Sequence, residues 1–122
     1  MRILLVDDES IIRRALRRAM ELRGHNVVEA ADGSSGLSFW QSSQFDAIIV
    51  DFQMPTMNGL EMIKLGLVSG AKTKAIVLMS ADKAATDSLS QIDFSPTRFL
   101  PKPFRDVFEV VSLIETLVAQ KA

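Results

Sequence analysis

The sequence has 122 residues, which suits one compact domain and leaves no room for a second folded unit. A hydrophobic content of 48% supports a real core, and 24% charged residues is ordinary for the surface of a soluble protein. The formal net charge of −1 gives no general attraction to nucleic acid or to an anionic membrane, and the lack of cysteine excludes disulfides and thiolate metal sites. We therefore expect residues 1–122 to form a single cytoplasmic domain that binds neither nucleic acid nor membrane directly.

Short apolar runs alternate with longer amphipathic segments along the chain. The runs cover residues 3–6, 26–30, 47–50, 75–79 and 98–100. Most of them are continuously apolar and rich in Ile, Leu and Val, as in parallel strands that are covered by helices on both faces. The alternation predicts a doubly wound α/β fold, with five helices around a flavodoxin-like sheet of five parallel strands in the common order 2-1-3-4-5.

The intervening segments have helical patterns of unequal quality. The first places Ile12, Ala15, Leu16, Ala19 and Met20 on one face, opposite Arg13, Arg14, Arg17 and Arg18, and ends before Gly24. The second covers about 34–41, the third opens at Asn58 with a capping box to Glu61, and the last covers about 104–119. The segment 84–93 is the poorest helix former, because its Ser, Thr and Asp side chains compete for backbone hydrogen bonds.

Polar side chains follow four of the five predicted strands directly. Asp7, Asp8 and Glu9 follow the first strand, Asp51 the third, Ser80 the fourth and Lys102 the fifth. Ligands bind such sheets beyond the carboxyl ends of the strands, so we expect these side chains to share one pocket. Neighbouring carboxylates repel one another unless some are protonated or a cation joins them, and Mg²⁺ suits an open site of carboxylates, waters and a phosphate oxygen.

This set of residues suits phosphoryl chemistry. A carboxylate can attack phosphorus and form an acyl phosphate, while Lys102 and Ser80 can donate hydrogen bonds to phosphoryl oxygens. Taken singly, each residue is as well explained by a helix cap, a turn or a solvated strand end. Their joint occurrence, each at the end of its own strand, favours the functional interpretation.

Four motifs, in order along nearly the whole chain, resemble those of response-regulator receiver domains of two-component signalling. They are Ile3-Leu4-Leu5-Val6-Asp7-Asp8-Glu9, Asp46 to Pro55 with Met57-Asn58-Gly59, Ile76-Val77-Leu78-Met79-Ser80-Ala81, and Phe99-Leu100-Pro101-Lys102-Pro103-Phe104. The resemblance implies a phosphoacceptor signalling module that promotes only its own phosphorylation and dephosphorylation, and is not an enzyme in the usual sense.

The resemblance also assigns roles to individual residues. Asp51 is the implied phosphoacceptor, and Mg²⁺, with Mn²⁺ as an alternative, is held directly by Asp8 and Asp51, through water by Asp7, and by the backbone carbonyl of Gln53. Ser80 and the backbone amide of Ala81 hold the phosphoryl group opposite Lys102, whose bond to Pro103 is typically cis. Ser80 and Phe99 form the switch.

The implied partners are a sensor histidine kinase or a histidine phosphotransfer protein as donor, and a downstream effector domain or target protein. The implied output surface comprises the fourth helix, the fifth strand and the fifth helix, and a dimer through this surface is a further expectation. The sequence departs from the family in this region, since residues 93–97 replace a frequent Gly-Ala pair and Phe99 replaces the more common Tyr. Phe99 is almost equally well explained as a core aromatic.

Other functions fit the residues less well. A flavin-binding protein needs a hydroxyl- and glycine-rich loop after the first strand, whereas Asp7-Asp8-Glu9 would repel its phosphate. An aspartate-nucleophile phosphatase needs a second carboxylate where Gln53 stands, and the P-loop motif of nucleotide enzymes is absent from the sequence. The main alternative is a degenerate receiver that acts as a phosphorylation-independent binding module. The sequence leaves open whether the domain acts alone or within a larger regulator.

Four further features are interpreted from the sequence. The arginine face of the first predicted helix favours a solvated surface, with partner selection as the alternative. The last predicted helix carries an unusually wide apolar surface, with Phe108, Val110, Leu113 and Leu117 beside its core positions, and part of it is assigned to partner or dimer contact. Trp40 fits either core or contact, and His25 is interpreted as a surface residue.

Overall fold

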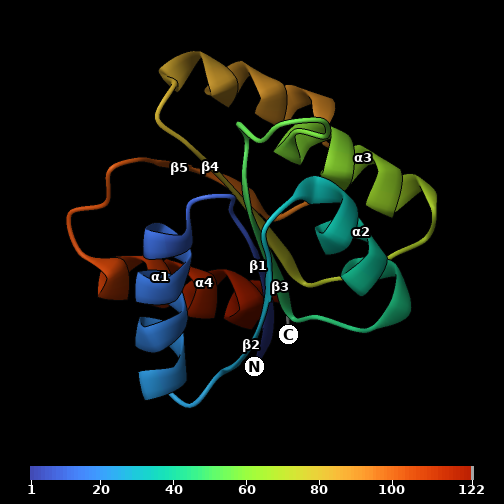
Figure 1. The fold of residues 1–122 in the computed structure, drawn as a ribbon. Coiled ribbons are helices and arrows are strands. Elements are labelled where there is room, and N and C mark those ends of the chain that lie inside the picture. The colour runs from blue at the N-terminus through green and yellow to red at the C-terminus, as the bar shows by residue number, and fades with distance from the viewer. Residues whose placement is uncertain (122) are drawn as a thin grey trace.

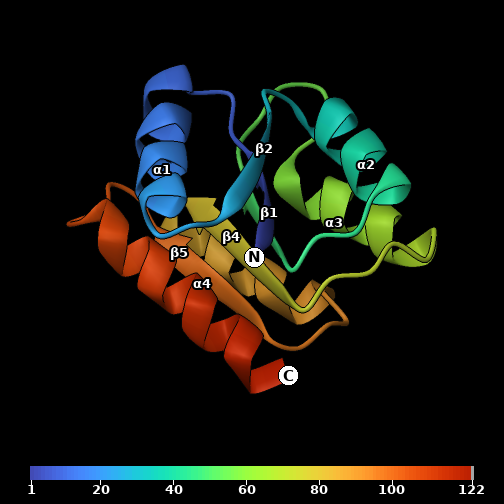
Figure 2. The same ribbon diagram turned by 90° about the horizontal axis from the view of Figure 1, so that it is seen from below.

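The computed structural model describes residues 1–121 and shows a parallel sheet with helices on both faces (Figures 1 and 2). The elements are β1 (Arg2–Val6), α1 (Ser10–Leu22), β2 (Asn26–Ala30), α2 (Gly33–Ser42), β3 (Ala47–Asp51), α3 (Gly59–Val68), β4 (Ala75–Ser80), the 3₁₀ helix η1 (Lys83–Gln91), β5 (Thr97–Pro101) and α4 (Val107–Lys121). The strands lie in the order β2-β1-β3-β4-β5, and every neighbouring pair is parallel. The predicted α/β fold and its strand order are confirmed.

Successive residues of the strands supply two separate cores. One face of the sheet is covered by α1 and α4 and the other by α2 and α3 (Figure 2). Ile3, Leu5 and Ile49 belong to the core on the first face, and Leu4, Val6 and Ile48 belong to the core on the second. The side chains of a strand alternate between the two faces of a sheet, so a strand that is covered on both faces must be apolar throughout. This requirement explains the continuous apolar runs.

The helix signals in the sequence correspond to observed helix ends. Gly24, two residues beyond α1, has a φ of 84°, a value that glycine adopts without a steric penalty. At α3, the amide of Glu61 donates to Asn58 Oδ1 at 2.9 Å and the amide of Asn58 donates to Glu61 Oε1 at 3.4 Å, which confirms the capping box. The predicted inner face of α1 is wrong at Ala15, which is exposed beside the buried Leu16 and Ala19.

The segment after β4 forms the fourth of the five predicted helices as a 3₁₀ helix, η1. Thr86 Oγ1 donates to the carbonyl of Lys83 at 2.8 Å, and Ser90 Oγ donates to the carbonyl of Asp87 at 2.9 Å. Each of these side-chain hydrogen bonds reaches a carbonyl three residues earlier in the chain. They compete with the backbone hydrogen bonds of an α-helix, which reach the carbonyl four residues earlier. The poor helix composition of the segment thus has a direct structural consequence.

The wide apolar surface of α4 is mostly interior. Val111 and Ile114 join the core beneath the sheet, and Val110 and Leu117 are buried as well, because α4 packs against both the sheet and α1. Phe108 remains 38% exposed, beneath the guanidinium of Arg23 at 5.7 Å from the ring centroid. Most of the surface that the sequence assigned to partners therefore belongs to the core. No helix among residues 1–121 combines the length and the apolar character that a bilayer-spanning segment requires.

Two single residues are also placed by the fold. Trp40 is buried, with its ring against Gly66, and its Nε1 donates to the carbonyl of Lys72 at 3.0 Å. The interpretation of His25 as a surface residue is wrong, since its side chain is only 10% exposed and its Nε2 lies 2.8 Å from Glu115 Oε2. Its partner lies 90 residues away in the sequence, which is why the local pattern did not reveal the contact.

Candidate functional site

The carboxyl ends of the central strands bring the predicted site residues to one edge of the sheet. Val6 of β1 pairs with Val50 of β3, so Asp7 and Asp51 follow at the same level of neighbouring strands. On the other side of β3, Asp51 pairs with Met79, the residue before Ser80. The amide of Lys102 then donates to the carbonyl of Ser80 at 2.9 Å. Sheet register alone therefore places all four at this edge.

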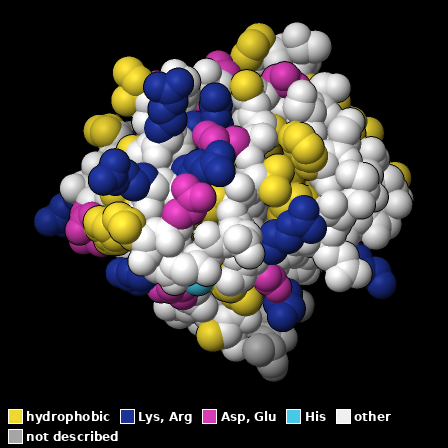
Figure 3. Space-filling view, turned by 60° about the horizontal axis from the view of Figure 1, so that its bottom comes forward, with side chains coloured by type: hydrophobic (Ala, Val, Ile, Leu, Met, Phe, Trp, Pro, Cys, Tyr) yellow, Lys and Arg dark blue, Asp and Glu magenta, His cyan; other side chains and the backbone are white. Residues whose placement is uncertain are grey.

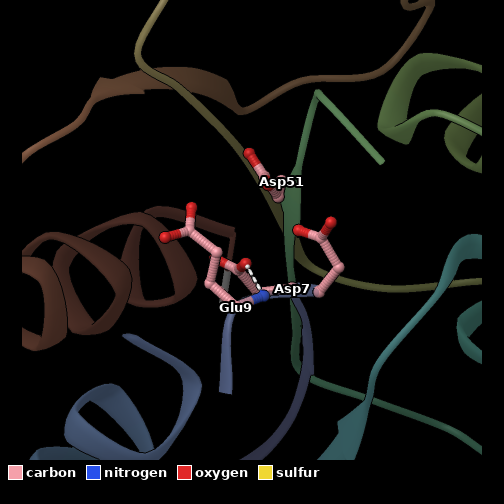
Figure 4. A group of neighbouring side chains, drawn as sticks. Asp7, Glu9 and Asp51 are labelled. Carbon is pink, nitrogen blue, oxygen red and sulfur yellow. Dashed lines mark hydrogen bonds between the residues drawn. The ribbon is translucent and has the colours of Figure 1, made fainter. Parts of the chain in front are cut away.

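Four carboxylates converge here: those of Asp7, Asp8, Glu9 and Asp51, whose nearest oxygens all lie within 4.8 Å of one another. Figure 4 shows Asp7 and Glu9 arriving from the end of β1 and Asp51 from the end of β3. Asp7 and Asp51 are buried, whereas Asp8 and Glu9 are exposed. Sequence reasoning placed Glu9 at the strand end but did not assign it to the metal site, so the structure adds a fourth carboxylate to the predicted three.

Lys102 is the cation of this cluster. Its Nζ lies 2.9 Å from Asp7 Oδ2, 3.2 Å from Glu9 Oε1 and 3.4 Å from Asp51 Oδ2. The side chain is only 7% exposed, so these contacts are little screened by water. One ammonium cannot neutralise four carboxylates, and the group thus retains an excess of negative charge. We call Asp7, Asp8, Glu9, Asp51 and Lys102 the acidic pocket.

Asp7 has one carboxylate oxygen whose hydrogen-bonding capacity is not used. Its Oδ1 accepts the amide of Glu9 at 2.8 Å (Figure 4). Its Oδ2 is fully buried and has no hydrogen bond, because the close ammonium of Lys102 meets it by charge without hydrogen-bond geometry. A buried oxygen with an unused lone pair, in an all-oxygen donor set, fits a hard cation such as Mg²⁺.

The electrostatics of Asp51 also indicate that the pocket suits a divalent cation. Burial and the neighbouring charge of Asp7 raise the pKa of Asp51 to about 6, although Lys102 opposes the shift. Burial alone would lower the pKa of Lys102. Its contacts with Asp7 and Asp51 raise the pKa by a larger amount, so the net shift is upward. Lys102 is therefore charged at neutral pH, while Asp51 ionises less readily than an ordinary aspartate. A divalent cation would favour the ionised form of Asp51.

The remaining predicted residues lie around the pocket in different ways. Ser80 is buried, and its Oγ accepts the amide of Asp82 at 2.9 Å. Ala81 and Gln53 are exposed in the turns that follow β4 and β3. Phe99 is half-buried in β5 and belongs to neither core, so the plain core interpretation of this residue is not supported. The Lys102–Pro103 bond is cis, as the resemblance implied.

Gly59 is a residue of the site whose role the sequence did not explain. A Cβ at this position would lie 2.5 Å from the carbonyl oxygen of Asp51 and 3.1 Å from Leu78 Cδ1. Only glycine lets the start of α3 approach the backbone of Asp51 so closely. The signal was present in Met57-Asn58-Gly59, but its meaning depends on a contact that the sequence does not show.

Comparisons with known proteins agree with this geometry. Residues 3–115 match the family model described as the response regulator receiver domain. The response regulator MprA of Mycobacterium avium is 35% identical over 104 residues, which are 85% of this chain and 45% of MprA. MprA of Mycobacterium bovis (strain BCG) is 34% identical over the same shares. The chain therefore spans about half the length of the curated relatives it matches.

Solved structures give the same result. The Francisella response regulator 1452 receiver domain has a TM-score of 0.85 and covers 99% of this chain and 98% of its own, but at 22% identity it supports the fold alone. The response regulator TrrA of Thermotoga maritima, solved in complex with Mg²⁺-BeF, has a TM-score of 0.81 and 28% identity, with 95% of this chain and 97% of TrrA covered. Vibrio cholerae chemotaxis protein CheY4 has a TM-score of 0.83, 28% identity and the same coverage.

Proposed function

This chain belongs to the response regulator receiver domain family of two-component signalling, and from that premise we propose that Asp51 accepts a phosphoryl group. The observation that carries the proposal is the convergence of Asp7, Asp8 and Lys102 on a buried Asp51 at one sheet edge. Residues 1–122 act in this proposal as one receiver domain. The surplus of carboxylates suits a domain that binds a divalent cation before it takes a further anionic group.

The pocket supplies each part of the transfer. An oxygen of the ionised Asp51 carboxylate attacks phosphorus, the bond from phosphorus to the donor imidazole nitrogen breaks, and its electron pair stays on that nitrogen. The product is an acyl phosphate on Asp51. A Mg²⁺ ion, or Mn²⁺ in its place, held by Asp7, Asp8, Asp51 and the carbonyl of Gln53, would neutralise charge on the carboxylates and the phosphoryl oxygens.

Lys102 is well placed to respond to these charges. Its Nζ lies within 3.4 Å of carboxylate oxygens of Asp7, Glu9 and Asp51. A phosphoryl group on Asp51 would offer this ammonium new oxygens without moving it far, and Ser80 and the amide of Ala81 are the donors on the opposite side in this proposal. The hydroxyl of Ser80 would exchange its bond with the Asp82 amide for the phosphoryl group.

The signal in this proposal passes from Ser80 to Phe99 and the surface of η1, β5 and α4. Phe99 is half-buried and belongs to neither core, so it can turn inward without leaving a core cavity. No hydroxyl would guide that movement, and apolar burial alone would drive it. A downstream effector domain or target protein reads this surface in the proposal, and pairing of two copies through it is the alternative use.

The proposed donor is a sensor histidine kinase or a histidine phosphotransfer protein, encountered in the cytoplasm. The domain is consumed as substrate, and in this proposal it promotes only its own phosphorylation and dephosphorylation. A degenerate receiver that binds partners without phosphorylation is less favoured, because Asp7, Asp8, Asp51 and Lys102 are all present and close together. The net charge of −1 supports partners other than nucleic acid.

The test is the intact mass of the chain after incubation with acetyl phosphate and Mg²⁺, for the native protein, Asp51→Asn and Asp46→Asn. Asp46 is the matched control, because it is a carboxylate just before the opposite end of β3, where its Oδ2 accepts the amide of Arg2 at 2.8 Å. We expect one phosphoryl adduct that requires Mg²⁺, persists in Asp46→Asn and disappears in Asp51→Asn. A folded native chain that forms no adduct and binds no beryllofluoride would overturn the proposal and favour the binding-only alternative.

A further inference from the structure

We propose that Arg13 is a positioning residue, which fixes the peptide between Asp7 and Asp8 and thereby sets the affinity of the acidic pocket for a divalent cation. The inference rests on the proposed function and extends it to a residue outside the pocket. It gives Arg13 a role that the other arginines of α1 do not have, although the sequence pattern placed all four on one face of the helix.

The contacts of Arg13 reach the loop after β1 directly. Its Nη1 donates to the carbonyl oxygen of Asp7 at 2.7 Å, and its Nε donates to Glu29 Oε1 at 3.0 Å. The side chain is only 17% exposed, which is unusual for an arginine on the outer side of a helix. A guanidinium that is held at two edges has one orientation, so the carbonyl it binds is also held in one direction.

That carbonyl belongs to the peptide unit whose nitrogen is the amide of Asp8. The peptide is planar, so the direction of the Asp7 carbonyl fixes the plane from which the Cα of Asp8 leaves. On the other side of Asp7, its own amide donates to the carbonyl of Ala30 at 3.1 Å. Asp7 is thus held at its amide by β2 and at its carbonyl by Arg13. These two bonds therefore position the backbone of Asp7 and Asp8, the first two of the three acidic residues that follow β1.

Glu29, on the edge strand β2, is the second residue that holds the guanidinium of Arg13. It binds Arg13 and also accepts a hydrogen bond from Arg17 Nη1. Burial disfavours the charged form of Glu29, but the hydrogen bonds from Arg17 and Arg13 outweigh it and lower its pKa overall. Glu29 is therefore ionised at neutral pH and offsets the charge of Arg13. The guanidinium can hold the loop without opposing a cation in the pocket.

The neighbouring arginines provide matched comparisons. Arg17 shares Glu29 but has no bond to the loop, since its other partner is Glu21 at 3.1 Å. Arg14 is exposed, and among residues 1–121 it has no ion pair. Figure 3 shows basic and acidic side chains interleaved on the side of the molecule that carries α1, so such pairing is common there. The bond to the Asp7 carbonyl is the contact that Arg13 makes and that Arg14 and Arg17 lack.

The experiment measures the dissociation constant of Mg²⁺ alone by titration calorimetry, for native protein and for Arg13→Met, Arg13→Lys, Arg14→Met and Arg17→Met. Loss of a group that orients metal ligands typically weakens metal binding by about 10- to 100-fold, and we expect at least about tenfold weakening in Arg13→Met. Arg13→Lys should recover part of the affinity, because an ammonium can make one of the two bonds. Arg14→Met and Arg17→Met should stay within about twofold of native.

A second readout separates positioning from stability. The melting temperature in a chelating buffer reports the fold without metal, and the phosphorylation rate at saturating Mg²⁺ should return to near the native value in Arg13→Met. If that variant does not fold, Arg13→Lys and Glu29→Gln make the same test, because each keeps the bulk of the side chain while weakening one bond. The dissociation constant should still rise in both.

The outcomes distinguish this inference from the proposed function. A native chain that binds no Mg²⁺ would overturn the proposed function and this inference with it. Native binding that is lost in Asp8→Asn but unchanged in folded Arg13→Met and Arg13→Lys would overturn only the role of Arg13. A lower melting temperature with an unchanged dissociation constant has the same meaning, since it would make Arg13 purely structural.

Discussion

The strands β1 and β3, which carry the carboxylates of the acidic pocket, are built differently from the segment that follows β4, which comprises η1 and β5. Every residue of β3 is buried, and β1 is buried apart from Arg2. In contrast, no residue of β5 is buried, and η1 buries only Ala85 and Ser88. The carboxylates of the pocket thus follow strands that close packing holds rigidly, whereas Lys102 follows β5, and the proposed output side has fewer buried contacts to resist movement.

The largest expected effect tests this contrast by matched truncation. Ile49 is fully buried in β3, and Ile49→Ala should lower the free energy of unfolding by about 3 kcal/mol. Leu89 of η1 is only partly buried, and Leu89→Ala should cost about 1 kcal/mol. Urea denaturation measures both. Equal losses would mean that η1 is packed as firmly as β3, and the proposed freedom of the output side would have to be abandoned.

The same contrast separates what the sequence predicted from what it did not. Continuous apolar runs identified β1, β3 and β4 to within a residue, because full burial on both faces permits only apolar side chains. The pocket followed from strand order, since polar residues after such runs must meet at one edge. The contacts of His25 with Glu115 and of Gly59 with Asp51 remained hidden, because each joins residues that no local pattern relates.

The helix η1 shows what composition alone can predict and what it cannot. Composition indicated a poor helix former, and a local rule was enough for that. It did not indicate a 3₁₀ helix of nine residues, which is longer than such helices usually are. The segment also makes contacts that composition does not reveal, such as the hydrogen bond that Lys64 Nζ donates to Gln91 Oε1 at 2.9 Å.

A smaller effect is expected from the charge of the pocket itself. The pKa of Asp51 is raised to about 6, while an unfolded aspartate has a pKa of about 3.9. Between these values the folded protein binds more protons than the unfolded chain, so this group lowers the free energy of unfolding as pH rises from about 4 to 6. Asp51→Asn removes the penalty, and at neutral pH without metal the variant should be more stable than native by about 1–2 kcal/mol.

Urea denaturation in a chelating buffer, at about pH 4 and about pH 7.5, measures this difference. The gain should be present at the higher pH and shrink toward zero at the lower one. Asp46→Asn serves as the control, because its carboxylate lies outside the pocket, beside Lys74 at 3.6 Å. Saturating Mg²⁺ should reverse the order of native and Asp51→Asn, because a ligand stabilises only the form that binds it. An Asp51→Asn variant that is less stable than native at neutral pH would contradict the assignment of a charge penalty to this buried site.

The smallest expected effect concerns the loop that leads from the rigid side of the sheet into α3. Thr56 has a φ of 71°, in the left-handed region that β-branched residues avoid. The residue is exposed, so Thr56→Asn lowers the steric cost of the same backbone conformation without loss of packing and should raise the free energy of unfolding by about 0.5–1 kcal/mol.

Thr116→Asn is the matched control for Thr56→Asn, because Thr116 is exposed in α4. Threonine and asparagine have similar helix propensities, so the effect of Thr116→Asn on the free energy of unfolding should be near zero. The dissociation constant of Mg²⁺ for Thr56→Asn then decides what the strain does. Unchanged affinity would make the strained loop a local cost that the packing of β3 and α3 imposes. Weakened affinity in a more stable variant would instead show that the strain holds the backbone near Gln53 in its binding position, and the rigid region of the pocket would extend beyond the buried strands into this loop.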